Sequence, residues 1–127
     1  MFGLSSSCSY AVLALSCLAG TGESWILARD LAQAIDAPLP YLSKILHGLT
    51  GAGIVEAKRG YRGGFRLTRR ADQLTVGEIV IAVEGPGFLE GCLLGKAECS
   101  DRRACPAHVF WGLERERIRA QLQRMTL

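Results

Sequence analysis

The stretch "LPYLSKILHGLTGAGIVEAKRGYRGGFRLTRR", residues 39–70, decides the fold. Pro40 suits the first turn of a helix, and "GAG" at residues 51–53 favours the end of that helix. Between them, apolar residues recur at helical spacing and form a predicted buried stripe of Leu42, Ile45, Leu46 and Leu49. The same spacing turns a polar side toward solvent, with Tyr41, Ser43, Lys44 and His47. We therefore predict a helix with one buried side and one exposed polar side.

The second half of this stretch predicts a basic β-hairpin, which we call the wing. Its two short strands are expected at residues 54–58 and 65–68. The tip between them has glycines that allow positive φ angles and a close approach to a partner: Gly60, Gly63 and Gly64. Arg59 and Arg62 place guanidinium groups on the tip, and residues 56–70 carry a net charge of +5 in a chain whose total is +3. Such a basic patch is either a solvated face or a contact for phosphate groups, and the motif beside it decides between these two interpretations.

The sequence before this stretch adds two helices. Residues 5–20, "SSSCSYAVLALSCLAG", begin with serines suited to an N-cap and continue with Tyr10, Leu13, Ala14 and Cys17 at helical spacing. A short second helix carries Leu27, Leu31, Ala34 and Ile35 and stops at "DAPLP", where two prolines disfavour helix. Helix, turn, helix and hairpin is the order of a winged helix-turn-helix domain, which binds double-stranded DNA.

We expect the third helix of this domain to enter the major groove and the wing to reach phosphates or the minor groove. On the helix, the predicted contact residues are Tyr41, Ser43 and Lys44, with Pro40 and His47 as further candidates. On the wing, they are Arg59, Gly60 and Arg62.

Residues 74–127 predict a fourth helix, a loop and a terminal helix. In "LTVGEIVIAVEG", residues 74–85, Thr75 suits an N-cap, and a core-facing side follows with Val76, Ile79, Val80 and Val83, packed on the first helix. Residues 85–104 lack periodicity. "PAHVFWGLERERIRAQLQRM", residues 106–125, restores a helix with an apolar side of Ala107, Phe110, Trp111, Ile118, Leu122 and Met125. Such a helix needs a partner, and a second copy of the chain is the economical one, with dimer contacts expected at Ile118, Leu122 and Met125.

The chain thus predicts a mainly α fold with a small β-wing: a winged helix-turn-helix domain at residues 1–84, a loop at 85–105 and a dimerisation helix at 106–127. Its 127 residues, 49% of them apolar, suit one compact core. The N-terminus has no basic leader, and the apolar run at residues 10–19 is too short to span a bilayer, so we expect a cytoplasmic protein without a membrane partner. In that reducing compartment, five cysteines favour metal binding or redox chemistry over disulfides.

Three of the cysteines lie close together in "GCLLGKAECSDRRACPAHVFW", residues 91–111, followed by a histidine: Cys92, Cys99, Cys105 and His108. Their spacing is neither the Cys-x2-Cys knuckle of structural zinc nor a ferredoxin run. Three thiolates and an imidazole could hold one tetrahedral zinc or the two irons of a 2Fe-2S cluster, and a structural loop with incidental cysteines is the third interpretation. His108 lies about one helical turn after Cys105, so its side chain can reach the same centre.

Nearly end to end, the chain resembles the IscR/NsrR/RirA-type winged-helix regulators of bacteria, the Rrf-two family. The segments that carry the resemblance are residues 39–70, "LTVGEIVIAVEG" and C-x6-C-x5-C-x2-H-x2-W. The resemblance implies an iron-sulfur cluster on Cys92, Cys99 and Cys105, a dimer through the C-terminal helix and a palindromic promoter site. "CPAHVFW" is similar to the IscR-like branch, in which a histidine completes a 2Fe-2S site, so His108 is the implied fourth ligand.

Other interpretations stay open at this point. The first cysteine gap is six residues where the family usually has five, and Cys8 lies beside Ser9, the position at which the NsrR-like branch has a carboxylate ligand for a 4Fe-4S cluster. Cys8 from a partner subunit could therefore be the fourth ligand, in a nitric-oxide sensor. A DNA-binding regulator with structural zinc or a thiol-disulfide switch would need the same residues, and a small electron carrier would not need the wing. No nucleophile-base pair, phosphate loop or pair of carboxylates indicates an enzyme.

Overall fold

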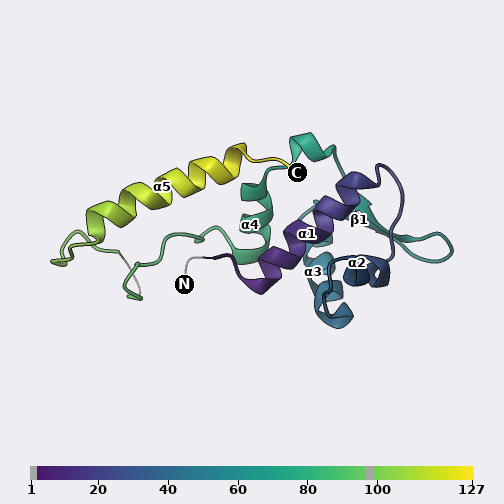
Figure 1. The fold of residues 1–127 in the computed structure, drawn as a ribbon, viewed down its shortest axis with the longest axis horizontal. Coiled ribbons are helices and arrows are strands. Elements are labelled where there is room, and N and C mark those ends of the chain that lie inside the picture. Colours follow the sequence, from purple (N-terminus) through teal and green to yellow (C-terminus); the bar gives the residue numbers. More distant parts are fainter. Residues whose placement is uncertain (1–2, 97–98) are drawn as a thin grey trace.

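The computed structural model describes residues 3–96 and 99–127 and confirms the mainly α fold with a small β-wing (Figure 1). Within these residues the elements follow the order α1 Ser6–Gly20, α2 Ala28–Ala34, α3 Leu39–Gly51, β1 Val55–Lys58, β2 Gly64–Leu67, a 3-10 turn η1 Ala71–Gln73, α4 Val76–Glu84 and α5 His108–Arg124. No helix in this described part combines the length and apolar character that crossing a membrane requires.

The first helix, α1, runs through the centre of the domain and packs against α3 and α4. The Ser5 hydroxyl accepts a hydrogen bond from the Cys8 N–H at 3.2 Å and caps the helix, as expected. Of the residues noted at helical spacing, Ala14 is buried and Leu13 is 49% exposed, and the buried side consists of Cys8, Ala11, Ala14, Leu15 and Leu18. Because α1 is apolar almost all round, its periodicity does not single out one side, and the packing of its neighbours selects it.

The second and third helices, α2 and α3, form the helix-turn-helix. On α3, Leu42, Leu46 and Leu49 are fully buried, which confirms the predicted stripe, and Ile45 lies partly buried at its edge. On α2 the buried residues are Leu31 and Ala32, whereas Leu27 precedes the helix and is 38% exposed. The short second helix is therefore present where the sequence predicted it, and Leu31 is the residue of the predicted spacing that is buried.

The wing strands β1 and β2 pair in antiparallel register from Val55 with Leu67 to Lys58 with Gly64. One contact was not predicted: Ile26 forms an additional antiparallel bridge with Phe65, through hydrogen bonds of 3.0 and 2.8 Å. A side chain at Gly64 would place its Cβ 2.3 Å from the Ile26 carbonyl oxygen, so this close approach requires glycine. The segment before α2 thus anchors the base of the wing.

The fourth helix, α4, begins with the predicted cap at Thr75. The Thr75 hydroxyl accepts a hydrogen bond from the Glu78 N–H at 3.1 Å, and the Glu78 carboxylate accepts one from the Thr75 N–H at 2.9 Å. This capping box satisfies two backbone donors at the start of the helix. The helix packs on α1 as expected, with Ile79 and Val80 fully buried.

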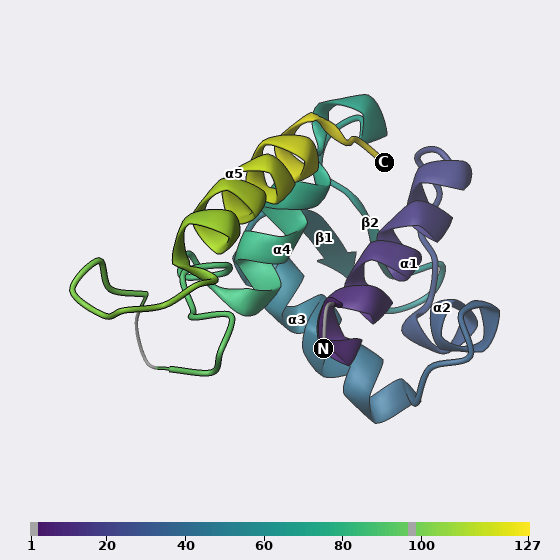
Figure 2. The same ribbon diagram turned by 60° about the vertical axis from the view of Figure 1, so that its left-hand side comes forward.

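The last helix, α5, contacts the domain near its C-terminal end. There it contacts α4, and the chain beyond it returns to the start of α4: the Val76 N–H donates to the Met125 carbonyl at 2.7 Å, and the Leu127 N–H donates to the Leu74 carbonyl at 3.2 Å. Figures 1 and 2 both show the His108 end projecting away from the domain, beside the chain that follows α4.

Candidate functional site

The exposed side of α3 carries the predicted major-groove residues. Lys44 and His47 are exposed and Ser43 is partly buried. Tyr41 is 41% exposed, but its hydroxyl lies 2.5 Å from the Ser7 hydroxyl, and its ring meets the Tyr10 ring edge-on with centroids 5.8 Å apart. The hydroxyl of Tyr41 therefore connects α3 to α1, which leaves the outer edge of its ring for a partner.

The tip of the wing is a tight turn closed by a hydrogen bond of 3.0 Å from the Gly63 N–H to the Gly60 carbonyl. Gly60 has a φ of +89°, and a Cβ at Gly63 would lie 2.2 Å from the Lys58 carbonyl oxygen. Glycine is thus required at both positions, as the sequence suggested. Arg59 and Arg62 are exposed on this turn.

The basic residues of the wing region divide into two groups. At its base, three arginines are neutralised by carboxylates: Arg66 with Glu56 at 2.5 Å, Arg69 with Glu78 at 2.9 Å and Arg70 with Asp72 at 2.6 Å. Among residues 3–96 and 99–127, the other three make no ion pair: Lys58, Arg59 and Arg62. The free positive charge of the region is therefore concentrated toward the tip.

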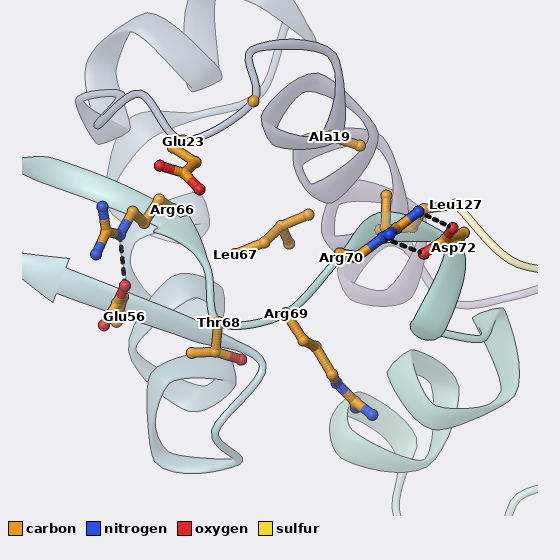
Figure 3. A pocket seen from close by; sticks show the side chains of 12 residues that line it. Ala19, Glu23, Glu56, Arg66, Leu67, Thr68, Arg69, Arg70, Asp72 and Leu127 are labelled. Carbon is orange, nitrogen blue, oxygen red and sulfur yellow. Dashed lines mark hydrogen bonds and ion pairs between the residues drawn. The ribbon is translucent and has the colours of Figure 1, made fainter.

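A pocket of about 680 Å³ lies at the base of the wing, between the end of α1 and η1 (Figure 3). It contains all three paired arginines, together with Glu23 and Thr68. Arg66 also lies over the Trp25 ring, 4.3 Å from its centroid, and the Lys58 ammonium lies 5.7 Å from the same centroid. Each of the three arginines that line this pocket is paired with a carboxylate.

Two of the four predicted metal ligands lie together where the loop meets α5. The Cys99 sulfur is 3.1 Å from Nδ1 of His108, and Nε2 of His108 is 2.5 Å from a carboxylate oxygen of Asp101. Asp101 was not predicted, since nothing in the sequence distinguishes it from other charged loop residues. With Nε2 engaged by the carboxylate, Nδ1 is the nitrogen that faces the thiol.

The other two predicted ligands are Cys92 and Cys105, and the Cys105 carbonyl accepts a hydrogen bond of 3.3 Å from the His108 N–H. The Cys92 sulfur accepts a hydrogen bond from the Leu94 N–H at 3.4 Å. Backbone N–H groups of Lys96 and Leu94, and then the charges of Arg103 and Lys96, lower the pKa of Cys92 and favour its thiolate. Within the residues that the structure describes, no three Cys, His, Asp or Glu side chains come close enough together to hold a metal ion. The set of four therefore stays a prediction.

The start of the loop is tied to α5. The indole N–H of Trp111 donates a hydrogen bond of 2.8 Å to the Gly91 carbonyl, next to Cys92. This contact brings the first predicted ligand toward the helix that carries the last one. Trp111 was predicted as part of an apolar side and as the last residue of the C-x6-C-x5-C-x2-H-x2-W motif.

Cys8, the alternative ligand, is a core residue. It is 0% exposed and packs with Val76 and Val80. Burial, and then the nearby charge of Glu84, raise the pKa of Cys8 to about 11, so its thiol stays protonated at neutral pH. A metal ligand must be deprotonated, and this environment argues against that role for Cys8.

The exposed apolar surface of α5 includes Phe110 of the predicted apolar side, which is 57% exposed, and Met125, which is 43% exposed and lies just beyond the end of the helix. Leu122 differs, because it packs against the cluster of Cys8, Val76 and Val80 in its own chain. The outer face of α5 also carries Val109 and Leu113, which are 72% and 60% exposed and were not predicted. Ile118 is 38% exposed. The predicted helix is present, but Leu122 is committed largely to its own domain.

Comparison with known proteins places this arrangement in a family. Residues 4–127 match the sequence profile of Rrf2, described as "Iron-dependent Transcriptional regulator". The "HTH-type transcriptional regulator IscR" of Cereibacter sphaeroides is 33% identical over 129 residues, covering 91% of this chain and 83% of that protein. The IscR of Vibrio atlanticus is 31% identical over 125 residues, covering 98% of this chain and 72% of that protein.

Comparison with solved structures gives the same kind of protein. The global cysteine regulator CymR of B. subtilis matches with a TM-score of 0.83 and 25% identity over 99% of this chain and 93% of that one. T. potens IscR matches with a TM-score of 0.79 and 25% identity, over 98% and 82%. With the family profile matching from residue 4 to residue 127 on the same winged-helix fold, the chain belongs to the Rrf2 family of DNA-binding transcriptional regulators.

Proposed function

We propose that this regulator is a cytoplasmic homodimer that senses redox, iron or nitric-oxide status through an iron-sulfur cluster, with 2Fe-2S favoured over 4Fe-4S. The proposed ligands are Cys92, Cys99, Cys105 and His108. The observation that carries the proposal is the 3.1 Å approach of the Cys99 sulfur to Nδ1 of His108, in a loop that contains the other two cysteines.

The residues of the loop fit such a centre by their chemistry. Thiolates are the usual ligands of iron-sulfur clusters, and imidazole replaces some of them in certain 2Fe-2S centres. The lowered pKa of Cys92 favours the ligating thiolate, and the contact with Asp101 orients His108 so that Nδ1 is presented. When bound, a cluster would supply sensitivity to oxidants and nitric oxide.

The position of the loop supports a regulatory role. Residues 85–107 connect α4, which packs against α1 and α3 of the DNA-binding domain, to α5. A change in the order of this loop would alter how α5 is held relative to that domain. In a dimer that pairs through α5, the two DNA-binding domains would then change their relative position, and with it their match to the half-sites of a palindromic promoter site.

The DNA-binding side of the proposal rests on α3 and the wing. Lys44 and Ser43 on α3 are the proposed major-groove residues, with Tyr41 contributing the outer edge of its ring. Arg59, Gly60 and Arg62 are the proposed wing contacts. The concentration of free positive charge toward the wing tip supports this assignment, because phosphate contacts provide much of the affinity for DNA.

Anaerobic purification followed by absorption spectroscopy and by iron, sulfide and zinc analysis tests the proposal. We expect about two irons and two sulfides per chain in the wild type, and loss of both in Cys92→Ala, Cys99→Ala and Cys105→Ala. Cys17→Ala is the matched control, because Cys17 lies on α1 at the edge of the domain core. A colourless protein that contains zinc would instead support a structural zinc site at the same residues. A protein that contains no metal would instead support a thiol-disulfide switch at the same cysteines.

A further inference from the structure

The wing tip exposes an aromatic ring that the proposed DNA contacts do not yet use. Tyr61 is 86% exposed, more than any other large apolar side chain in the described residues. The guanidinium of Arg62 lies 5.2 Å from the centroid of its ring. An aromatic ring left in water at the end of a hairpin is poorly explained by the stability of the chain, since burial is what makes such rings stabilising.

The backbone at the next residue points in the same direction. Tyr61 and Arg62 are the two central residues of the turn closed by Gly60 and Gly63. Arg62 has a φ of +56°, in the left-handed region. A turn of this kind favours glycine at its third position, and here the chain has glycine on both sides but arginine at that position. Strained residues of this sort are retained where the side chain serves a function.

We propose that Tyr61 and Arg62 form a preorganised DNA-binding pair, in which the tyrosine ring packs on a deoxyribose and the guanidinium binds the adjacent phosphate. The stacking between the two side chains holds the guanidinium in place before DNA arrives, which lowers the entropic cost of binding. The exposed ring then loses its water against the apolar sugar. Both contacts are independent of base sequence, so the pair fixes the position of the wing on the DNA backbone.

This inference rests on the proposed DNA contact of the wing and is tested without knowledge of the promoter site. The probe is a mixed-sequence duplex of 30 base pairs, titrated with the full chain by fluorescence anisotropy at several salt concentrations. We expect Tyr61→Ala to weaken binding about tenfold without changing the salt dependence. Tyr61→Phe should bind within about twofold of the wild type, because it keeps the ring.

Arg62→Gly should change two measured quantities: it should reduce the salt dependence of DNA binding and raise the melting temperature of the protein. The logarithm of the affinity should depend less steeply on salt, with the slope reduced by about 0.9, the value for one phosphate contact. The melting temperature should rise, because glycine relieves the left-handed backbone at this position. Arg117→Ala is the matched control: Arg117 is an exposed arginine on α5, which lies at the opposite end of the molecule from the wing (Figure 1).

Two results would overturn the inference: binding of Tyr61→Ala within about twofold of the wild type, or an unchanged salt slope in Arg62→Gly. A wild-type chain that binds no duplex would contradict the DNA-binding function itself, and the two failures are therefore distinguishable. Circular dichroism melting of each variant shows that any loss of binding occurs in a folded protein.

Discussion

Arg59 lies at the start of the wing turn, directly before Gly60, where the backbone has the positive φ that lets it approach DNA closely. It is exposed and makes no ion pair within the described residues. If its guanidinium makes a specific contact in the minor groove, Arg59→Ala should weaken binding to the promoter site by about 1 to 3 kcal/mol. A gel-shift titration measures this, and unchanged affinity would remove Arg59 from the interface.

Variants of His108 and Cys8 distinguish the two candidates for the fourth ligand of the proposed cluster. His108→Ala should leave an incomplete site that loses iron readily, whereas His108→Cys should keep the cluster more firmly, because an anionic thiolate replaces a neutral imidazole. Cys8→Ala should bind as much iron as the wild type, since Cys8 is buried in the core. Iron and sulfide per chain, together with absorption spectra of anaerobic samples, check all three variants. Iron that persists in His108→Ala but is lost from Cys8→Ala would reverse the assignment.

A second readout at the same histidine does not depend on a cluster. With Nε2 of His108 at 2.5 Å from Asp101, the metal-free protein should hold the imidazole with its proton on Nε2. Nitrogen chemical shifts of His108 in wild type and Asp101→Ala would show the tautomer directly. Equal populations of both tautomers in the wild type would mean that Asp101 does not orient the ring.

At the scale of single elements, α3 and the wing could be predicted almost in full, whereas for α1 the helix and its cap could be predicted but its buried side could not. On α3, apolar and polar residues alternate with helical period, so its buried side follows from the sequence. On α1, apolar residues occur on every side, and only contacts with α3 and α4 select Ala11 and Leu15 over Leu13. The bridge between Ile26 and Phe65 was missed for a related reason: a single residue paired across the sequence leaves no periodic pattern.

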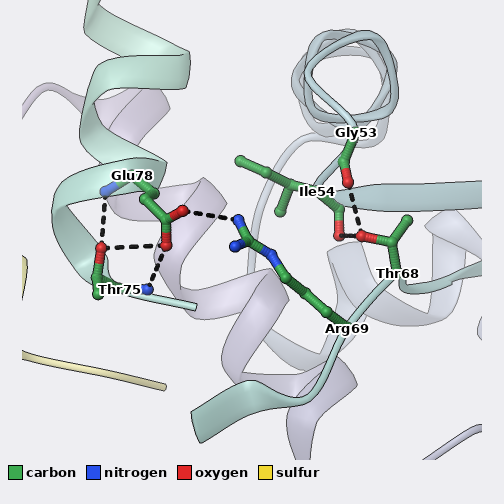
Figure 4. A network of polar contacts seen from close by, with 6 residues as sticks. All are labelled: Gly53, Ile54, Thr68, Arg69, Thr75 and Glu78. Carbon is green, nitrogen blue, oxygen red and sulfur yellow. Dashed lines mark hydrogen bonds and ion pairs between the residues drawn. The ribbon is translucent and has the colours of Figure 1, made fainter. Parts of the chain in front are cut away.

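The start of α4 joins the helix to the wing through one carboxylate. Glu78 completes the capping box with Thr75 and also accepts a hydrogen bond of 2.9 Å from Arg69, the residue that follows Thr68 at the exit of the wing (Figure 4). Thr68 in turn donates to the carbonyls of Gly53 and Ile54 at the end of α3. The hydrogen bond from the Thr75 N–H, and then the interaction with Arg69, lower the pKa of Glu78.

Glu78→Ala should therefore destabilise the protein by about 1 kcal/mol at pH 7, through loss of the cap. Because the pKa of Glu78 is lower in the folded state, its carboxylate stabilises the fold above the ordinary carboxyl pKa, and this contribution is lost as the pH falls through the folded value. The difference in melting temperature between wild type and variant should shrink on acidification to about pH 3. Glu114→Ala, at an α5 surface ion pair, is the control and should change stability little at either pH. A pH-independent difference for Glu78→Ala would show that the charge contributes nothing.

At the scale of the whole molecule, the outer face of α5 is the surface that a second copy would cover in the proposed dimer. Val109→Asp combined with Leu113→Asp should give monomers that keep the fold of the DNA-binding domain, because both side chains are exposed in the single chain. Ile118→Asp combined with Leu122→Asp should also disrupt the dimer but lower stability as well, since Leu122 packs against Cys8 and Val80. Sedimentation velocity and thermal melting separate the two effects. A Val109→Asp, Leu113→Asp variant that still sediments as a dimer would remove this face from the interface.

The cysteine loop shows where prediction from the sequence ends. The residue types of the proposed ligands and their order could be found from spacing, because thiols and an imidazole rarely gather in a polar loop by chance. Their partners could not: Asp101 and the Gly91 carbonyl bonded by Trp111 depend on how an aperiodic loop folds back on α5. The packing of Leu122 on its own domain could not be predicted for the same reason, since the return of the chain to Leu74 and Val76 decides which side of α5 faces the domain.

The hydrogen bonds of the chain after α5 with Leu74 and Val76 also hold the C-terminal end of this helix in place, so the helix can turn about that end. A helix of 17 residues is about 25 Å long at a rise of about 1.5 Å per residue. With its C-terminal end bonded to Leu74 and Val76, a shift of about 2 Å at His108 turns the helix by about 5° around that end. In the proposed dimer, which pairs through α5, a rotation of about 5° would displace a point about 34 Å away, the spacing of two half-sites, by about 3 Å. That displacement is close to the rise of about 3.4 Å from one base pair to the next, so a movement of about 2 Å in the cysteine loop would change how the second head fits its half-site.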